Sequence, residues 1–113
     1  MRLPNADRAV VDPAKIRDYL LSHEHEVGGS KAIVFESVGY QSQSWELLRT
    51  DLLAIAVLPG AEFTGLTRHG RKFRLPASLL GPAGRELVVT TVWIVRWEED
   101  FPRFVTAYLG VRS

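Results

Sequence analysis

The chain has no cysteine among its 113 residues. Disulfide bonds, thiolate metal ligands and cysteine nucleophiles are therefore excluded. The absence also fits a reducing compartment, so we expect a cytoplasmic protein. Long apolar runs are missing too, since none approaches the roughly 18 residues that span a bilayer. The opening MRLPNADRAVVDP lacks the apolar core of a signal peptide, and we expect no membrane association.

The sequence also lacks an excess of charge of either sign. Fourteen lysines and arginines nearly balance thirteen aspartates and glutamates, which leaves a net charge of +1. A nucleic-acid-binding domain of this size is often far more basic. Any binding of phosphate must therefore depend on a local patch.

The apolar residues that are present predict a single domain over residues 1–113. They make up 46% of the chain, enough for one modest core. Apolar side chains recur at helical spacing in the first half. We expect up to three helices there, capped in turn by Asp12, Ser30 and Ser44: residues 13–21, 31–38 and 45–58.

The second half changes to a strand pattern. Four segments separated by turn residues predict strands: residues 61–68, 71–80, 85–97 and 103–111. The third segment, RELVVTTVWIVRW, is apolar on both faces and should be central. Helices followed by an antiparallel meander predict the α+β class, with two or three N-terminal helices packed on a twisted antiparallel sheet of about four strands.

A tight hairpin at residues 81–84 would set the register of the two middle strands. Phe73 would then oppose Val92, and Lys72 would oppose Trp93. Phe73, Val92 and Ile94 would face the helices. The opposite, open face would carry Lys72, Arg74, Thr91 and Trp93.

The second hairpin has an ambiguous loop length. If residue 97 pairs with residue 103, Ile94 opposes Thr106, and Arg96 shares a face with Thr106 and Tyr108. A slip of one residue would exchange the two faces. An arginine with two hydroxyls on a rigid sheet could hold a phosphate.

A dense basic stretch lies at residues 68–74. Its basic side chains, with Trp93 and Trp97 nearby, could grip a phosphate chain and stack a base. The alternative is a charged edge strand that resists aggregation. The members of the stretch are Arg68, His69, Arg71, Lys72 and Arg74.

The segment HEHEVGGSK, residues 23–31, allows three interpretations. His23 and His25 would point ~200° apart on a helix, whereas on an extended segment they would lie on the same side and could share a metal. No third histidine lies near them in sequence, so we expect no metal site. Alternatively, His25 could act as a general acid or base beside Lys31, with glycine amides and a helix start favouring an anion. A solvated loop without chemistry is the third interpretation.

Several blocks resemble a bacterial domain family of unknown function: LPNADRAVVDPAKIRDYLL, HEVGGSKAIVF, GRKF, VWIVR and EEDFPRFVTAY. Members of that family occur as small proteins, some beside candidate antitoxin genes, and as C-terminal modules of phage or toxin-like proteins. The arrangement is similar to the barnase–EndoU–colicin–RelE ribonuclease superfamily, which places helices before a four-stranded antiparallel sheet and cleaves RNA without metal.

The resemblance implies a set of site residues by motif: His25, Lys31, Arg96, Thr106 and Tyr108. The chain departs from the family pattern at Ser30, where many relatives carry a histidine. We therefore expect a metal-independent ribonuclease-like toxin domain without a cofactor, in which His25 moves a proton. Lys31 and Arg96 would stabilise the phosphorane, and Thr106 and Tyr108 would position the phosphate.

RNA would be the partner of such a domain, bound through Arg71, Lys72, Arg74 and Trp93. An antitoxin or immunity protein would be a second partner. The alternative function is a non-catalytic interaction module: an antitoxin, an immunity protein or a phage-associated adaptor. Its contact patch would be formed by Trp97, Phe101 and Phe104.

Overall fold

Helices occupy the first half of the chain and strands the second half. The computed structural model describes residues 1–24 and 29–109, without the side chains of residues 29 and 30. The helices are α1 (Pro13–Lys15) with its π-helical continuation η2 (Ile16–Leu20), α2 (Gly29–Ser37) and α3 (Trp45–Ala56). Short 3-10 turns lie at Ala6–Arg8 and Ser42–Ser44.

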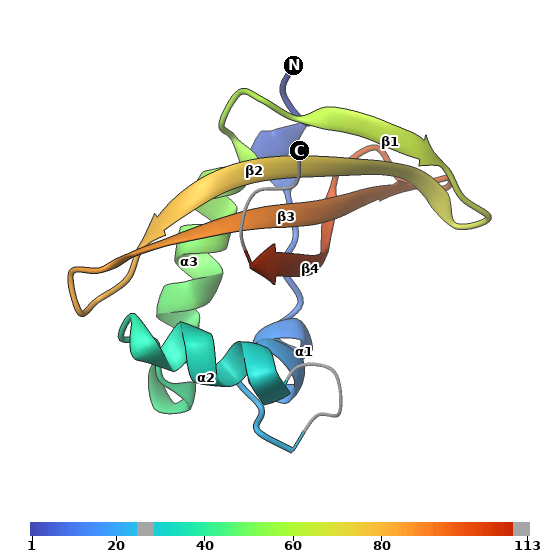
Figure 1. Ribbon diagram of the computed structural model, residues 1–113. Helices are drawn as coiled ribbons and strands as arrows, with labels where there is room; N and C mark the ends of the chain where they lie inside the picture. The colour runs from blue at the N-terminus through green and yellow to red at the C-terminus, as the bar shows by residue number, and fades with distance from the viewer. Residues whose placement is uncertain (25–28, 110–113) are drawn as a thin grey trace.

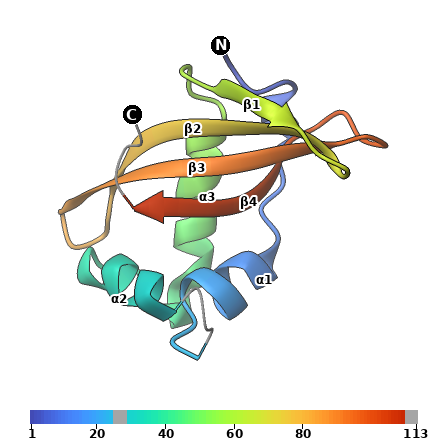
Figure 2. The ribbon, with the colours of Figure 1, turned by 45° about the vertical axis from the view of Figure 1, so that its right-hand side comes forward.

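Four antiparallel strands follow, in the spatial order β1-β2-β3-β4. They are β1 (Glu62–Leu66), β2 (Gly70–Leu80), β3 (Glu86–Arg96) and β4 (Arg103–Leu109). In Figures 1 and 2, α1 and α2 lie below the twisted sheet, α3 rises behind its strands, and the β1–β2 hairpin projects beyond the helices. The predicted α+β meander is confirmed, and β3 lies between β2 and β4, as expected. In the part of the chain that the structure describes, no helix has the length and apolarity to cross a bilayer.

The predicted caps are correct at the first helix only. Asp12 Oδ1 accepts a hydrogen bond from the backbone N–H of Ala14 at 2.9 Å. Ser44 is the N-cap residue of α3, but its side chain makes no capping hydrogen bond and donates instead to the carbonyl of Gln41 at 3.5 Å. The α2 helix begins at Gly29, so Ser30 lies inside the helix rather than before it.

The end of α2 is fixed to the turn between β2 and β3. Gly39 ends the helical segment with φ +108°, a left-handed conformation that glycine adopts without strain. The backbone N–H of Ala83 donates to the carbonyl of Val38 at 3.0 Å. A Cβ on Gly81 would lie 2.0 Å from the same carbonyl oxygen, so only glycine allows this approach. This contact fixes α2 relative to the sheet.

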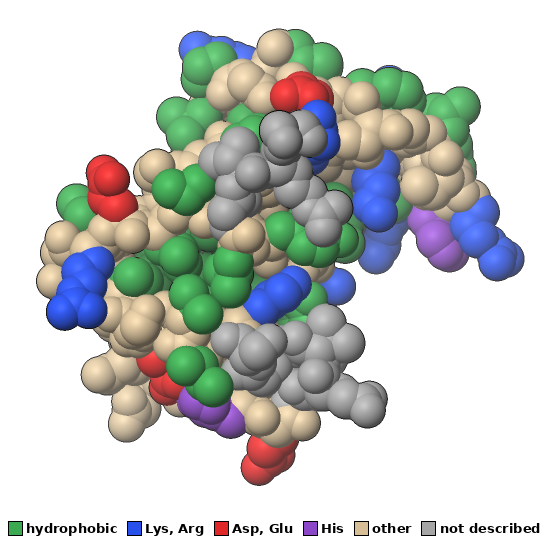
Figure 3. All heavy atoms as spheres, in the orientation of Figure 1, with side chains coloured by type: hydrophobic (Ala, Val, Ile, Leu, Met, Phe, Trp, Pro, Cys, Tyr) green, Lys and Arg blue, Asp and Glu red, His purple; other side chains and the backbone are tan. Residues whose placement is uncertain are grey.

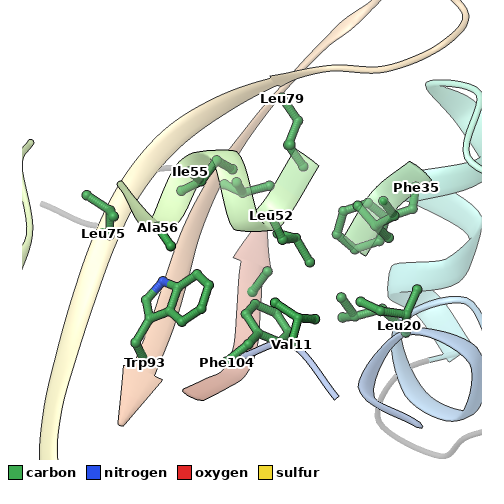
Figure 4. Close-up of a cluster of buried hydrophobic side chains, with 14 of the residues drawn as sticks. Val11, Leu20, Phe35, Leu52, Ile55, Ala56, Leu75, Leu79, Trp93 and Phe104 are labelled. Atoms are coloured by element: carbon green, nitrogen blue, oxygen red, sulfur yellow. The ribbon is translucent and has the colours of Figure 1, made fainter. Parts of the chain in front are cut away.

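The core lies between the helices and one face of the sheet. Trp93 is fully buried at its centre, and its ring meets that of Phe104 edge-on, with centroids 5.4 Å apart. Figure 4 shows the indole pointing toward side chains of α3 and β4. The indole Nε1 donates to Thr91 Oγ1 at 2.8 Å, and that hydroxyl donates to the carbonyl of Leu75 at 2.8 Å.

The predicted register of β2 and β3 is wrong by one residue. Phe73 opposes Trp93, and Lys72 opposes Ile94. The strands end at the pair of Leu80 with Glu86, so the loop holds an odd number of residues rather than the even number of a tight hairpin. A shift of one residue moves every β3 side chain to the other face. Thr91 and Trp93 therefore face the helices, whereas Val92 and Ile94 face away.

The second hairpin differs from the expected pairing by two residues near its end. Val92, rather than Ile94, opposes Thr106, and the ladder shifts again at a bulge beside Val105. A shift of two residues keeps each side chain on its own face. Arg96 therefore shares a face with Thr106, as predicted.

The buried Thr91 hydroxyl allows a test of the register. We expect Thr91→Val to lower the free energy of unfolding by about 1–3 kcal/mol, because it leaves a buried indole N–H without an acceptor. Urea unfolding measures the change. The control is Thr64→Val, because the exposed Thr64 hydroxyl donates to a carbonyl near solvent, and the change should be below about 0.5 kcal/mol. Equal losses in both variants would contradict the burial of Thr91.

Candidate functional site

The Lys31 ammonium joins three elements at the place where the helices meet β4. Lys31 Nζ donates to Tyr19 Oη and to Thr106 Oγ1, at 3.0 Å each. The two hydroxyl oxygens lie 2.8 Å apart and share a hydrogen bond. Tyr19 comes from η2, Lys31 from α2 and Thr106 from β4.

Two aromatic rings flank the same ammonium. Lys31 Nζ lies 5.2 Å from the ring centroid of Tyr19 and 5.2 Å from that of Tyr108, within the range of a cation–π interaction. We call Lys31, Tyr19, Thr106 and Tyr108 the Lys31 cluster. Among the carboxylates of the described residues, none forms an ion pair with Lys31. The cluster thus joins a positive charge to hydroxyl groups, a combination suited to a phosphate.

The cluster perturbs the ionisation of Tyr19. Partial burial, the largest single influence, raises the pKa of the Tyr19 phenol. Hydrogen bonds from Lys31 and Thr106, with the charges of Lys31 and Lys15, act in the opposite direction. Together they outweigh burial, so the pKa of Tyr19 lies below its ordinary value.

Two of the predicted RNA-binding residues lie beside the cluster. Lys72 and Arg74 line a cavity of about 170 Å³ together with Tyr108. Arg74 is already bound to Glu62, with Nη2 2.8 Å from Oε2. Lys72 has no ion-pair partner among the described carboxylates, so its charge is not offset as that of Arg74 is.

The other two predicted RNA-binding residues lie elsewhere. Arg71 is exposed, but it is the neighbour of Lys72 in β2. Because neighbouring side chains of a strand point to opposite faces, Arg71 points away from the face that carries Lys72. The expected position of Trp93 on the open face is wrong, because the side chain is 0% exposed in the core and offers no ring to a base. The alternative of a charged edge strand is also wrong, since β2 lies between β1 and β3.

Arg96 shares the open face but is not part of the cluster. It lies four residues beyond Val92, the residue that pairs with Thr106, which corresponds to roughly 13 Å along the strand. It lines a cavity of about 120 Å³ with Lys15 and Asp12. Arg96 and Lys31 therefore lie at different places on the open face, and the structure does not bring their charges together.

The histidine segment lies largely outside the described residues, and His25 is among those outside. His23 is exposed and pairs with Glu36 of α2. Within residues 1–24 and 29–109, no three metal-ligating side chains converge.

The three aromatic residues predicted to form an exposed contact patch differ in exposure. Phe104 is 3% exposed and belongs to the core. Phe101 is half-buried under Arg103, whose guanidinium lies 5.1 Å from the ring centroid. Trp97 remains open to solvent, with 54% of its surface exposed.

Tyr19 is the site residue that sequence reasoning missed. In the sequence, Tyr19 has helical spacing with Ile16 and Leu20, which predicts a place on the apolar face of the first helix. The available signal was its hydroxyl, since a half-buried tyrosine usually needs a polar partner. That partner, Thr106, is 87 residues away in the chain, so no local pattern could reveal it.

The fold and the site define an α+β protein with a cationic, hydroxyl-lined cluster where helices and sheet meet. The chain belongs to the family described as Domain of unknown function (DUF6883), whose model matches residues 2–111. No curated protein matches the sequence significantly.

One similar solved structure is the contact-dependent growth inhibition toxin–immunity protein complex from Klebsiella pneumoniae 342. A chain of that complex superimposes with a TM-score of 0.74 and 16% sequence identity, over 95% of this chain and 97% of that chain. At this identity the likeness shows a common fold.

The opposed influences on Tyr19 generate a prediction about its titration. We expect Lys31→Met to raise the pKa of Tyr19, because burial then acts without the neighbouring ammonium. NMR titration of ring-labelled tyrosine from about pH 8 to pH 12 measures the shift. Tyr40 is the internal control, since burial and then its hydrogen bond to Asp51 raise its pKa in both proteins. A Tyr19 titration unchanged by the substitution would contradict the described geometry.

The same shift has a stability consequence of defined sign. Because the folded-state pKa of Tyr19 is depressed, its ionisation contributes stability above the ordinary pKa of about 10. That contribution is lost as the pH falls through the folded-state pKa, and it is absent at neutral pH.

Proposed function

We propose that this protein is a metal-independent ribonuclease-like toxin domain that acts on RNA at the Lys31 cluster. The observation that carries the proposal is the ammonium of Lys31, held by two hydroxyls and two aromatic rings. A charge held in this way is preorganised for an anion and needs little rearrangement when the anion binds. The fold is shared with one chain of a toxin–immunity complex, which supports a role in a toxin system and fits both the toxin and its partner.

The proposed reaction is an internal transfer at phosphorus. The ribose 2′-oxygen forms a bond to phosphorus while the bond to the 5′-oxygen of the next nucleotide breaks. The products are a 2′,3′-cyclic phosphate and a free 5′-hydroxyl. One proton leaves the 2′-hydroxyl and one reaches the departing oxygen, so no water or metal is consumed in this step.

Each group of the cluster has a role in that step. Lys31 would neutralise the negative charge that grows on the non-bridging oxygens. The hydroxyls of Thr106, Tyr19 and Tyr108 would orient those oxygens. His25 remains our proposed proton carrier, because the α2 segment that carries Lys31 begins four residues after it.

Lys72 extends the site toward a neighbouring phosphate. It lines the same cavity as Tyr108, and the Tyr108 ring contacts Lys31. RNA bound across the Lys31 cluster would therefore place one flanking phosphate near Lys72.

A second candidate function is a partner-binding module, such as an immunity protein. Exposed apolar side chains on the edge strand β1 favour it, since Phe63 is 51% exposed and Leu66 is 69% exposed. Such residues often mark a protein contact. A protein of this kind would protect cells from a toxin and would leave RNA intact.

Substitution of Lys31 tests the leading proposal. We expect Lys31→Ala to slow RNA cleavage by about 10²–10³-fold, as loss of one preorganised group at a charged transition state does. Thr106→Val should slow it by about tenfold, because one of several oxygen contacts is lost. The measurement is cleavage of total RNA, with end analysis for cyclic phosphate and growth after induced expression. Arg85→Ala, at the far turn of β2 and β3, is the control.

The outcomes separate the two candidates. Cleavage by the wild type and Arg85→Ala, but not by Lys31→Ala, supports the nuclease. Loss of activity on addition of EDTA would contradict the metal-independent step. A wild-type protein that leaves RNA intact and protects cells against a toxin would favour the partner-binding module.

A further inference from the structure

We propose that a groove beside the Lys31 cluster binds the single-stranded flank of an RNA and stacks one of its bases on Trp97. This inference rests on the proposed function and names its substrate class, unpaired RNA. The groove, which we call the Arg96 groove, runs from Lys15 past Arg96 to Arg68 and Trp97.

Two cavities join to form the Arg96 groove. The first, of about 120 Å³, is lined by Lys15, Arg96 and Arg103 among others. The second, of about 440 Å³, is lined by Arg68, His69, Arg96 and Trp97 among others. Both are lined by Ile94 and Arg96, so they lie next to each other on the outer side of β3, and an extended ligand can follow one into the other.

The groove begins next to the Lys31 cluster. Lys15 lines its first cavity, and Lys15 Nζ also lies 5.9 Å from the ring centroid of Tyr19. A strand held by Lys31 and Tyr19 would therefore meet Lys15 first and Arg96 next. On the other side, the cavity of Tyr108 and Lys72 continues the open face. The reacting phosphate would lie between these two cavities.

The charge of the groove suits a polyanion. Four basic side chains line it against two carboxylates, Asp12 and Glu98. Arg103 is bound to Glu99 at 2.7 Å. The other three, Lys15, Arg68 and Arg96, have no ion pair with a carboxylate in residues 1–24 and 29–109. Figure 3 shows lysine and arginine side chains gathered on the projecting β1–β2 hairpin, above a hollow.

Trp97 is oriented for stacking. Its indole Nε1 donates to the carbonyl of Thr67 at 3.2 Å, and its backbone N–H donates to the carbonyl of His69 at 3.3 Å. These bonds hold the ring in position while 54% of the residue stays exposed. Stacking on such a ring requires an unpaired base, because the bases of a duplex are covered by their neighbours. The groove therefore selects single strands.

The test measures binding separately from cleavage. A fluorescent 2′-O-methyl RNA of about a dozen nucleotides lacks the attacking hydroxyl, so the wild-type protein can be used without cleavage. We expect Trp97→Ala to weaken its affinity by about tenfold or more, since one base stack is lost. Trp97→Phe keeps an aromatic face and loses the same Nε1 bond, so it should bind within about threefold of the wild type. Arg85→Ala is the control for charge, and circular dichroism checks folding.

The inference would be overturned by no binding of the single strand by the wild type, by equal binding by Trp97→Ala, or by tighter binding of the corresponding duplex. Unmodified RNA that stays intact while Trp97→Ala still lowers affinity would contradict the nuclease but support the groove. A loss with Trp97→Phe as large as with Trp97→Ala would assign the effect to the Thr67 bond and contradict stacking.

Discussion

The connection between β2 and β3 decides which side of the sheet every side chain of the two longest strands occupies. Its odd number of residues opposes Phe73 to Trp93, and thereby directs the indole into the core. The same parity leaves Lys72 and Arg96 on the outer face. The turn also holds α2 through the contact of Gly81 with Val38. Core, open face and helix position therefore share one geometric origin.

The Lys31 cluster follows from that arrangement. Once α2 is fixed, its first turn lies beside η2 and β4, and Lys31 meets the hydroxyls of Tyr19 and Thr106. Hydroxyls and rings hold the ammonium without cancelling its charge, whereas a carboxylate would neutralise it. Since burial alone would raise the pKa of Tyr19, its lowered pKa reflects the hydrogen bonds and the nearby positive charge. The local charge matters here, because the whole chain carries a net charge of only +1.

Two cavities on the open face lie on either side of the Lys31 cluster. One side holds Lys72 beside Tyr108, and the other side holds Arg96 and Trp97. A surface that presents cations on two strands and an exposed aromatic ring just beyond the end of β3 can follow a chain of phosphates and bases. The exposed apolar side chains of β1 lie at the sheet edge, where a protein partner could contact them without covering the Lys31 cluster.

The sequence by itself determined the order of the elements, because helical and strand periodicities are local properties of neighbouring residues. It determined the helix start at Asp12 and the central place of β3. The family resemblance also predicts Lys31 and Thr106 as site residues, and the structure brings their side chains together. Only the tertiary structure decided the register and the cluster. Whether the loop between β2 and β3 holds an odd or an even number of residues decides which face of the sheet each side chain of β3 occupies. Lys31 contacts Thr106, which lies 75 residues away in the chain. Contacts at that separation depend on how layers pack, which no local pattern encodes.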